Sequence, residues 1–179
     1  AAVSGGPGGT AHVLQPTASW SPLPGGGVWL TDGATYEVRR YDGEGALRSI
    51  LRRPGSRVAL TEGLKTAFRE SLGAAADGPT MLALLEKAVY PDSLPATTGL
   101  WAVEPEGLLW VGVSDAGLPL RLEAPNTWDV FAPDGAYLGR LPIPKGLRPT
   151  RITSGYVYGV WLDELEVTHA RRYRIVRGE

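Results

Sequence analysis

Three segments of the chain share one pattern of apolar and polar residues. Each begins at a glycine and continues as a β-branched and aromatic run, at residues 27–30 (GVWL), 107–113 (GLLWVGV) and 155–162 (GYVYGVWL). Runs of this kind, bounded by Gly and Asp, are typical of buried strands. A strand that carries aromatic residues is predicted after each run, at residues 36–41, 127–131 and 169–175.

Tight turns follow the first two of these strand pairs. Residues 42–45 (DGEG) and 132–135 (APDG) have the Asp, Pro and Gly that suit a turn between antiparallel strands. A further strand is predicted after each turn, at residues 47–51 and 137–142. The repeat is therefore a four-stranded meander, present at residues 18–53, 99–142 and 149–177, and its last copy ends after the third strand.

This repeat predicts a mainly β fold: a partial β-propeller of about three four-stranded antiparallel blades, the last one incomplete. We assign residues 18–179 to it. Residues 1–17 are expected to be a flexible N-terminus in which 11–15 (AHVLQ) form the outer strand of a preceding blade. One segment departs from the pattern, because apolar residues at helical spacing predict a helical hairpin inserted at residues 61–90.

The composition of the chain argues against several classes of function. The net charge of the 179 residues is −1, with 18 basic and 19 acidic residues, which gives no electrostatic case for nucleic acid or an anionic membrane surface. Cysteine is absent, so cysteine metal sites and thiolate nucleophiles are excluded. No apolar run has the length of a transmembrane segment, and residues 1–10 have neither the basic nor the apolar region of a signal peptide.

The C-terminal part resembles bacterial six-bladed β-propeller proteins related to the NHL-type repeat. The resemblance is carried by residues 128–135 (WDVFAPDG), by Leu138-Gly139 and by residues 156–165 (YVYGVWLDEL). The helical insert, followed by Leu94-Pro95 and a strand pair, is also similar to that group. The resemblance implies a propeller whose other blades lie upstream in the same protein, and an extracytoplasmic (periplasmic or secreted) location. It implies no particular reaction.

Acidic residues recur in equivalent loops of the repeat. Asp32, Asp115 and Asp163 each follow the second strand of a unit, so these loops are expected on one face of the ring, with Glu164 and Glu166 nearby. Their oxygens could hold a cation such as Ca²⁺, or a polyhydroxyl or amine ligand. Asp is also a preferred turn residue after a strand, and we favour that interpretation.

The six tryptophans are candidate aromatic platforms for a ligand. Four lie inside apolar strand runs and are expected in the core: Trp29, Trp101, Trp110 and Trp161. Trp20 and Trp128 are left as candidate ligand contacts.

Other constellations favour ordinary structural roles. His12 and His169 lack the spacing of a metal site or a triad, and the stretch 112–117 (GVSDAG) is not a nucleophile elbow. The glycine runs lack a phosphate-loop motif. A basic cluster near the C-terminus consists of Arg171, Arg172, Arg174 and Arg177. Because side chains alternate along a strand, these arginines are expected on opposite faces and not in one patch. We expect them to form ion pairs with Glu164 or Glu166.

The sequence therefore favours a non-catalytic propeller module that binds a small ligand or a protein through loops on one face, without a required cofactor. The alternative is a metal-dependent hydrolase of the lactonase or gluconolactonase kind, for which the chain offers Glu104, Asp115 and Asp163. A third hypothesis is a truncated fragment, whose exposed blade edges would promote self-association.

Overall fold

The computed structural model of the chain describes residues 11–54, 57–73, 78–114, 127–144, 146–153, 155–163 and 167–176. Within these ranges the strands form three antiparallel sheets, and the order of strands in each sheet follows the order of the chain. We call these sheets blade 1, blade 2 and blade 3.

Each blade is a meander. Blade 1 comprises β1 (Ser19–Pro22), β2 (Val28–Thr31), β3 (Glu37–Tyr41) and β4 (Leu47–Arg52). Blade 2 comprises β5 (Thr97–Val103), β6 (Leu108–Val113), β7 (Thr127–Phe131) and β8 (Tyr137–Pro142). Blade 3 has three strands, β9 (Leu147–Ile152), β10 (Tyr156–Leu162) and β11 (Thr168–Arg174).

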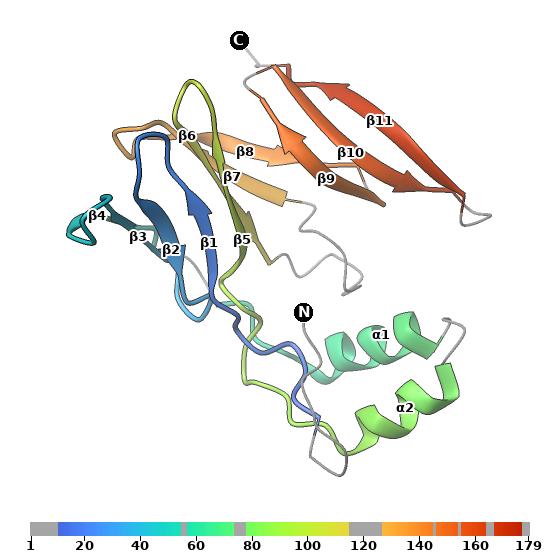
Figure 1. Ribbon diagram of the computed structural model, residues 1–179. Coiled ribbons are helices and arrows are strands. Elements are labelled where there is room, and N and C mark those ends of the chain that lie inside the picture. Colours follow the sequence, from blue (N-terminus) through green and yellow to red (C-terminus); the bar gives the residue numbers. More distant parts are fainter. Residues whose placement is uncertain are drawn as a thin grey trace.

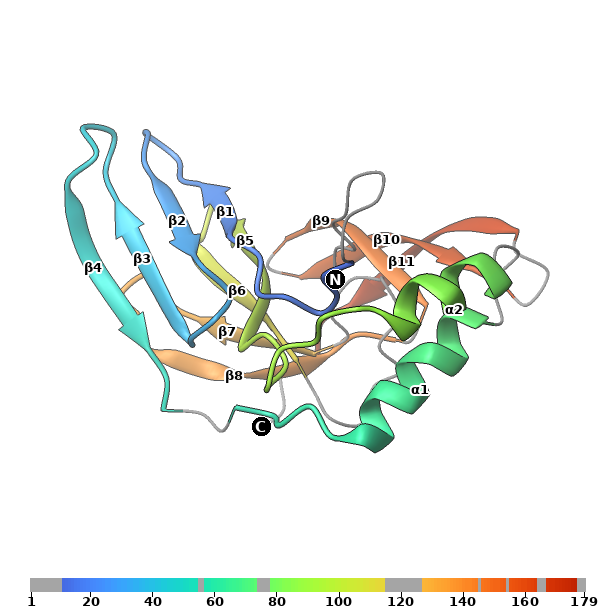
Figure 2. The same ribbon diagram turned by 90° about the horizontal axis from the view of Figure 1, so that it is seen from below.

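The three sheets follow one another in space as they do in the chain. Blade 2 lies between blade 1 and blade 3, and the sheets fan out rather than stack in parallel layers (Figures 1 and 2). The mainly β fold is thus confirmed as a partial β-propeller with an incomplete last blade and an inserted helical hairpin.

The turns between outer strands have the predicted chemistry. The Asp42 carboxylate accepts backbone N–H bonds from Glu44 and Ala46 at 3.0 and 2.9 Å. Gly45 has a φ of 82°, which an L side chain rarely adopts. The second turn repeats the arrangement, with Asp134 as acceptor and Gly135 at a φ of 90°.

Alternation along the strands sends side chains to the two boundaries of blade 2. One set packs against blade 1 in a cluster formed by Trp29, Val38, Leu100, Leu109, Val111 and Phe131. The other set packs against blade 3 in a cluster formed by Val103, Trp110, Trp128, Ile143, Leu147, Ile152 and Val157. Both faces of blade 2 are therefore buried, as expected of a central blade.

The helical hairpin consists of α1 (Glu62–Gly73) and α2 (Gly78–Glu86). Thr61 caps α1, since its hydroxyl accepts the backbone N–H of Leu64 at 3.3 Å. The hairpin lies beside the sheets (Figures 1 and 2) and has its own buried cluster around Phe68 and Leu85, both 0% exposed. Neither of these helices is long and apolar enough to cross a membrane.

Residues 11–15 lie against this hairpin instead of pairing within a blade. Val13 and Leu14 belong to the buried cluster of the helices. The backbone N–H of Val13 donates to the carbonyl of Val89 at 3.2 Å, and His12 forms an isolated parallel bridge with Val89. Burial of Val13 and Leu14 against the helices explains this position. The pairing of this segment with a preceding blade stays a prediction.

Candidate functional site

The loop between β2 and β3 is fixed to the start of blade 2. The hydroxyls of Thr31 and Thr97 are buried and lie 2.9 Å apart. The carbonyl of Gly33 accepts the backbone N–H of Ala96 at 2.8 Å. Gly33 has a φ of 79°, and a Cβ built there would lie 2.7 Å from the carbonyl oxygen of Thr17. Only glycine allows this close approach, so the sequence holds the loop across the boundary between the blades.

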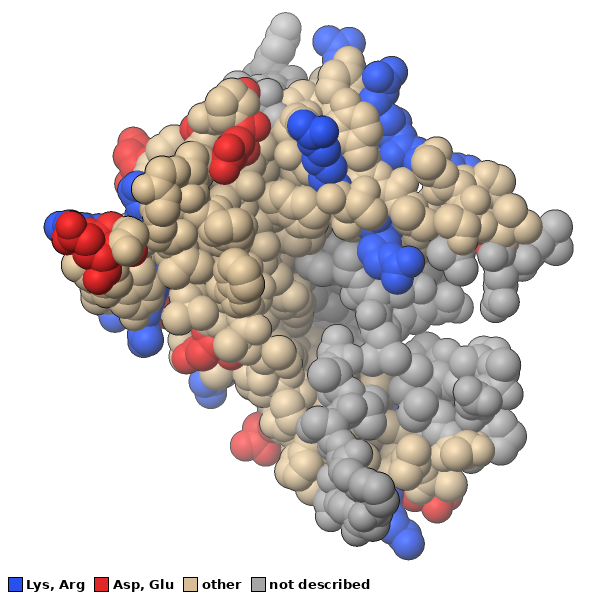
Figure 3. Space-filling view, in the orientation of Figure 1, with Lys and Arg blue, Asp and Glu red and all other residues tan. Residues whose placement is uncertain are grey.

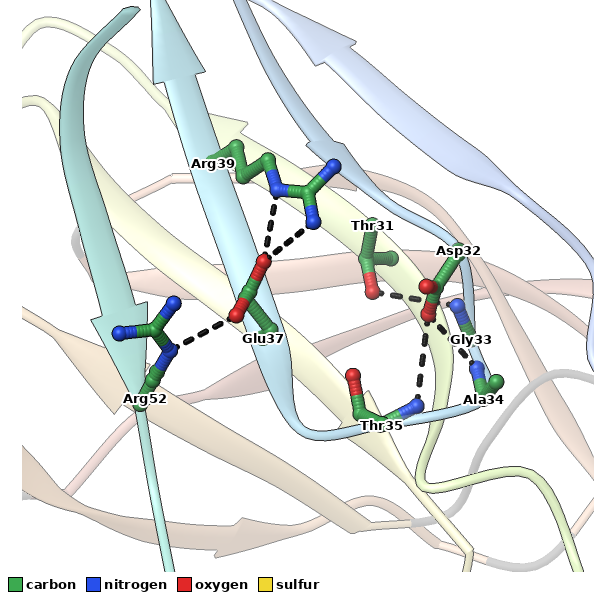
Figure 4. Close-up of polar contacts among 8 residues, drawn as sticks. All are labelled: Thr31, Asp32, Gly33, Ala34, Thr35, Glu37, Arg39 and Arg52. Carbon is green, nitrogen blue, oxygen red and sulfur yellow. Dashed lines mark hydrogen bonds and ion pairs between the residues drawn. The ribbon is translucent and has the colours of Figure 1, made fainter.

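Asp32 caps this loop. Its Oδ1 accepts the backbone N–H groups of Ala34 at 2.9 Å and Thr35 at 3.3 Å (Figure 4). This is the ordinary turn chemistry of an aspartate that follows a strand. In the same view the Glu37 carboxylate pairs with Arg39 at 2.6 Å and with Arg52 at 2.7 Å. Hydrogen bonds from Arg52 and then Arg39 lower the pKa of Glu37.

Asp163 caps the equivalent loop of blade 3, between β10 and β11. Its Oδ1 accepts the backbone N–H of Val167 at 2.8 Å, and its Oδ2 lies 2.8 Å from Nε2 of His169. The other predicted acidic ligands, Asp115, Glu164 and Glu166, lie outside the described residues. Within the described part of the chain, no three His, Asp or Glu side chains gather as a metal site.

A cleft of about 500 Å³ opens beside the loop between β2 and β3. Its wall combines the end of that loop, the ends of β4 and β6 and the two connections to the helical hairpin. The lining residues that matter below are Tyr36, Arg52, Arg53, Arg57, Val58 and Pro95. The volume falls within the usual range for small-molecule sites. The cleft therefore lies next to the Asp32 loop, at the end of blade 1 where the sequence predicts binding.

Two lining residues of the cleft, Tyr36 and Arg53, contact a buried carboxylate. Asp129 on β7 is 0% exposed, and its Oδ2 accepts a hydrogen bond from the Tyr36 hydroxyl at 2.9 Å and forms an ion pair with Nη1 of Arg53. On the other side Oδ1 accepts Nε of Arg140 at 2.9 Å and the hydroxyl of Tyr137 at 3.3 Å. One aspartate of blade 2 thus fixes two cleft residues of blade 1.

Burial and the neighbouring charges shift the pKa of the Asp129 carboxylate in opposite directions. Burial alone raises the pKa of Asp129, but hydrogen bonds from Arg140, Arg53 and Tyr36 outweigh it, and the pKa lies below its usual value. Burial and the charge of Asp129 raise the pKa of Tyr36. The hydrogen bond to Asp129 raises the pKa of Arg53. At neutral pH the network therefore contains an aspartate anion, a neutral tyrosine and charged arginines.

Among the described residues, Arg57 is the arginine of the cleft that has no carboxylate partner. Arg52 is paired with Glu37, and Arg53 is paired with Asp129. Within the described part of the chain, the exposed Arg57 side chain donates one hydrogen bond, from its Nη2 to the carbonyl of Ala34 at a long 3.5 Å. A guanidinium at the rim of a cleft whose N–H groups are not all hydrogen-bonded can bind an anionic group through two parallel hydrogen bonds.

The two candidate aromatic contacts have different positions. Trp20 on β1 is 65% exposed. Trp128 is wrongly predicted as a ligand contact, because it is 3% exposed and its ring packs 6.3 Å from that of Trp110 at the boundary with blade 3. The expected core positions of Trp29 and Trp110, 3% and 2% exposed, are confirmed.

The inner strands of the three blades border a second cleft, of about 390 Å³. It is lined by ends of β1, β5 and β9, and includes Glu104 and Arg151. Glu104 lies in the turn between β5 and β6, whereas Asp163 lies in the loop after β10. These two residues of the hydrolase hypothesis thus belong to opposite ends of their blades, and Asp115 is outside the described residues. Among the described lining residues, Glu104 is the single carboxylate of this cleft.

The sequence analysis identified neither the Asp129 network nor the position of Arg57 beside the cleft. Asp129 had one available signal, since it is a charged residue inside a strand whose other residues are mostly buried (TWDVF). Such a residue needs a partner of opposite charge. The charged partner from the other blade, Arg53, is however 76 positions away, and the neutral Tyr36 is 93 positions away.

Comparisons with known proteins find likeness to solved structures but not to family models or curated sequences. No protein-family model matches the chain, and no curated protein matches it in sequence. A catalytically inactive virginiamycin B lyase from Staphylococcus aureus, solved with quinupristin, matches 84% of this chain and 39% of its own with 12% identity and a TM-score of 0.38. A streptogramin B lyase structure matches 85% of this chain and 53% of its own, with 13% identity and a TM-score of 0.32. The chain spans less than two thirds of either protein, and we base no functional argument on these likenesses.

Proposed function

We propose that the chain is a non-catalytic β-propeller module that binds a small organic acid in the cleft between blade 1 and the connections to the helical hairpin. The observation that carries the proposal is the Arg57 guanidinium, which borders a cleft of about 500 Å³ and has no carboxylate partner among the described residues. The ligand would bind on the side of the ring that carries the Asp32 loop.

The composition of the cleft supports an acid with an apolar body. Arginine binds carboxylates through two parallel hydrogen bonds, and the interaction gains strength in a partly desolvated site. The apolar part of the cleft wall is formed by Pro54, Val58, Pro95 and Ala96. A ligand whose carboxylate contacts Arg57 and whose apolar part lies along this wall would satisfy both features.

The arrangement of the walls supports a preformed site. The loop between β2 and β3 is held by Gly33 and the Thr31–Thr97 contact. Arg53 is held by Asp129 and by the ring of Tyr137, whose centroid lies 4.6 Å from the guanidinium carbon. A site fixed before binding loses less conformational entropy when the ligand enters.

We also propose an architecture and a location for the whole protein to which this chain belongs. We infer a ring of six blades completed by upstream blades of the same protein, and an extracytoplasmic location, both from the family resemblance. A Ca²⁺ site in the acidic loops of Asp32, Asp115, Asp163, Glu164 and Glu166 is a separate proposal, which a rise in the melting temperature of the chain with millimolar Ca²⁺ would support.

Calorimetric titration with paired ligands tests the binding function. We expect benzoate, phenylacetate and cyclohexanecarboxylate to include a ligand that the chain binds, and the matching amides to bind at least tenfold more weakly. Arg57→Gln should weaken carboxylate binding about tenfold, the effect of about 1.4 kcal/mol. Arg48→Gln is the matched control, since Arg48 is exposed, pairs with Asp42 and lies outside the cleft.

Two results would contradict this function. Equal affinity for acids and amides, or equal loss in the Arg57 and Arg48 variants, would show that the cleft does not recognise a carboxylate. Turnover of lactones that requires Ca²⁺ would instead favour the hydrolase hypothesis, so the same protein is assayed with a lactone panel with and without Ca²⁺.

A further inference from the structure

The second cleft, of about 390 Å³, opens where the inner strands β1, β5 and β9 end. Each of these strands is the first of its blade and forms one edge of its sheet (Figures 1 and 2). In a propeller the blades surround a central channel, and the inner strands line that channel. A further blade packs on the flat face of the last sheet and not on this inner edge, so a closed ring leaves the second cleft open to the channel.

Contacts within and between the blades fix the wall of the second cleft. The Ser21 hydroxyl on β1 accepts the backbone N–H of Ala102 on β5 at 2.9 Å. Thr153 directly follows β9, and its hydroxyl accepts the backbone N–H of Tyr156 at 3.1 Å. The half-buried Trp101 ring packs against the apolar cluster between blades 2 and 3. The second cleft is therefore formed before a ligand enters, which lowers the entropic cost of binding.

Two opposite charges border the second cleft without pairing. Glu104 follows β5, Arg151 lies near the end of β9, and both are exposed. Within the described part of the chain, no ion pair joins either of them to the other or to a third residue. Figure 3 shows red side chains over the turn between β5 and β6 and blue side chains over β9, on the same side of the molecule.

We propose that the second cleft binds a small zwitterion with an apolar body, of the amino-acid or dipeptide class. Its ammonium group contacts Glu104 and its carboxylate contacts Arg151, so each charge of the ligand meets a charge of opposite sign. The Trp101 ring and Pro22 give the second cleft its apolar surface, and its volume suits a small molecule. This site is separate from the cleft beside the β2–β3 loop, since the two share no described lining residue.

The charges of the second cleft argue against other ligands. Arg151 attracts a plain carboxylate, but Glu104 repels it, and the reverse holds for a plain amine. Glu104 is the single carboxylate among the described lining residues, whereas Ca²⁺ takes six or more oxygen ligands. A ligand that carries both charges is therefore the one that this wall favours.

Calorimetric titration tests this proposal with L-phenylalanine, glycyl-L-phenylalanine and 6-aminohexanoate, whose two charges lie at different separations. We expect at least one of them to bind, and its N-acetylated and amidated forms to bind about tenfold more weakly. Glu104→Gln should weaken binding of the zwitterion about tenfold but should not weaken binding of the N-acetylated form, which has no ammonium group. Arg151→Gln should likewise weaken binding of the zwitterion and spare the amidated form.

The matched controls lie next to the two charged residues but outside the second cleft. Glu106→Gln changes the same turn as Glu104, and Arg148→Gln changes the same strand as Arg151. Each should change the affinity for the zwitterion by less than about twofold. All four side chains are exposed, so every variant should keep the melting temperature of the unmodified chain.

Three results would overturn the proposal. The first is that none of the three zwitterions binds. The second is that Glu104→Gln weakens the zwitterion and its N-acetylated form equally, because Glu104 would then not contact an ammonium group. The third is that Arg57→Gln abolishes binding of the zwitterion while Glu104→Gln leaves it unchanged, since the ligand would then occupy the cleft beside the β2–β3 loop.

Discussion

The two boundaries of blade 2 are built from different chemistry. The boundary with blade 3 is apolar and contains two tryptophans, Trp110 and Trp128, both almost fully buried. The boundary with blade 1 is apolar in part, but it also encloses the carboxylate of Asp129 with its two arginines and two tyrosines. The cleft adjoins the second kind of boundary.

This difference follows from what each boundary must do. Apolar packing is strong and without direction, so it suits a boundary that only holds two blades together. A buried ionic network contributes less net stability, because desolvation of its charges offsets their attraction. It does, however, fix the directions of the groups it binds, and here these include Tyr36 and Arg53 of the cleft wall. We infer that the polar boundary is retained for the cleft that it shapes.

The largest expected effect comes from the apolar boundary. Trp110→Ala should lower the free energy of unfolding by about 3–5 kcal/mol, because it removes a large side chain and leaves a cavity. Urea unfolding followed by circular dichroism measures the change. Trp110→Phe is the matched control and should cost less, since most of the packing remains. A loss below about 1 kcal/mol for the alanine variant would show that this boundary does not carry the stability we assign to it.

A smaller effect is expected at the polar boundary. Asp129→Asn removes the buried charge and should cost about 2 kcal/mol at pH 7. The value stays below that for a fully buried pair because the side chains of Arg53 and Arg140, 34% and 48% exposed, can be hydrated again. The same urea titration measures it, and Asp42→Asn, at an exposed ion pair in the turn of blade 1, is the control.

The free energy of unfolding should depend on pH through the polar boundary and not through the apolar boundary. The pKa of Asp129 is lowered in the folded chain. Its contribution is therefore complete above the ordinary aspartate pKa of about 3.9 and is lost as the pH falls below it. The stability of Asp129→Asn should fall less steeply with acid than that of the unmodified chain, whereas Trp110→Phe should keep the original slope. Identical slopes for the Asp129→Asn variant and the unmodified chain would contradict the network.

The sequence predicts the blades because their determinants are local. Apolar runs, the Asp42 and Asp134 turns and the helical periodicity of residues 61–90 each depend on neighbours within a few positions, and the structure contains these elements. The turn role of Asp32 and Asp163 was foreseen for the same reason, since Asp binds backbone N–H groups two to four residues ahead.

The cleft depends on contacts between distant segments, so no local pattern reveals it. The Asp129 network joins residues of two blades, and Arg57 lines the cleft together with Tyr36, which is 21 positions earlier in the chain and follows the loop between β2 and β3. The strand β9 is hard to predict for another reason, because it contains Pro149, which weakens its strand signal.

A crystal structure of the chain with the tightest-binding carboxylate tests the central claim most directly. The account predicts the ligand in the cleft beside the β2–β3 loop, with its carboxylate oxygens within about 3 Å of the Arg57 guanidinium and its apolar part against Val58 and Pro95. A ligand bound instead in the cleft between the inner strands, next to Glu104 and Arg151, would contradict the account.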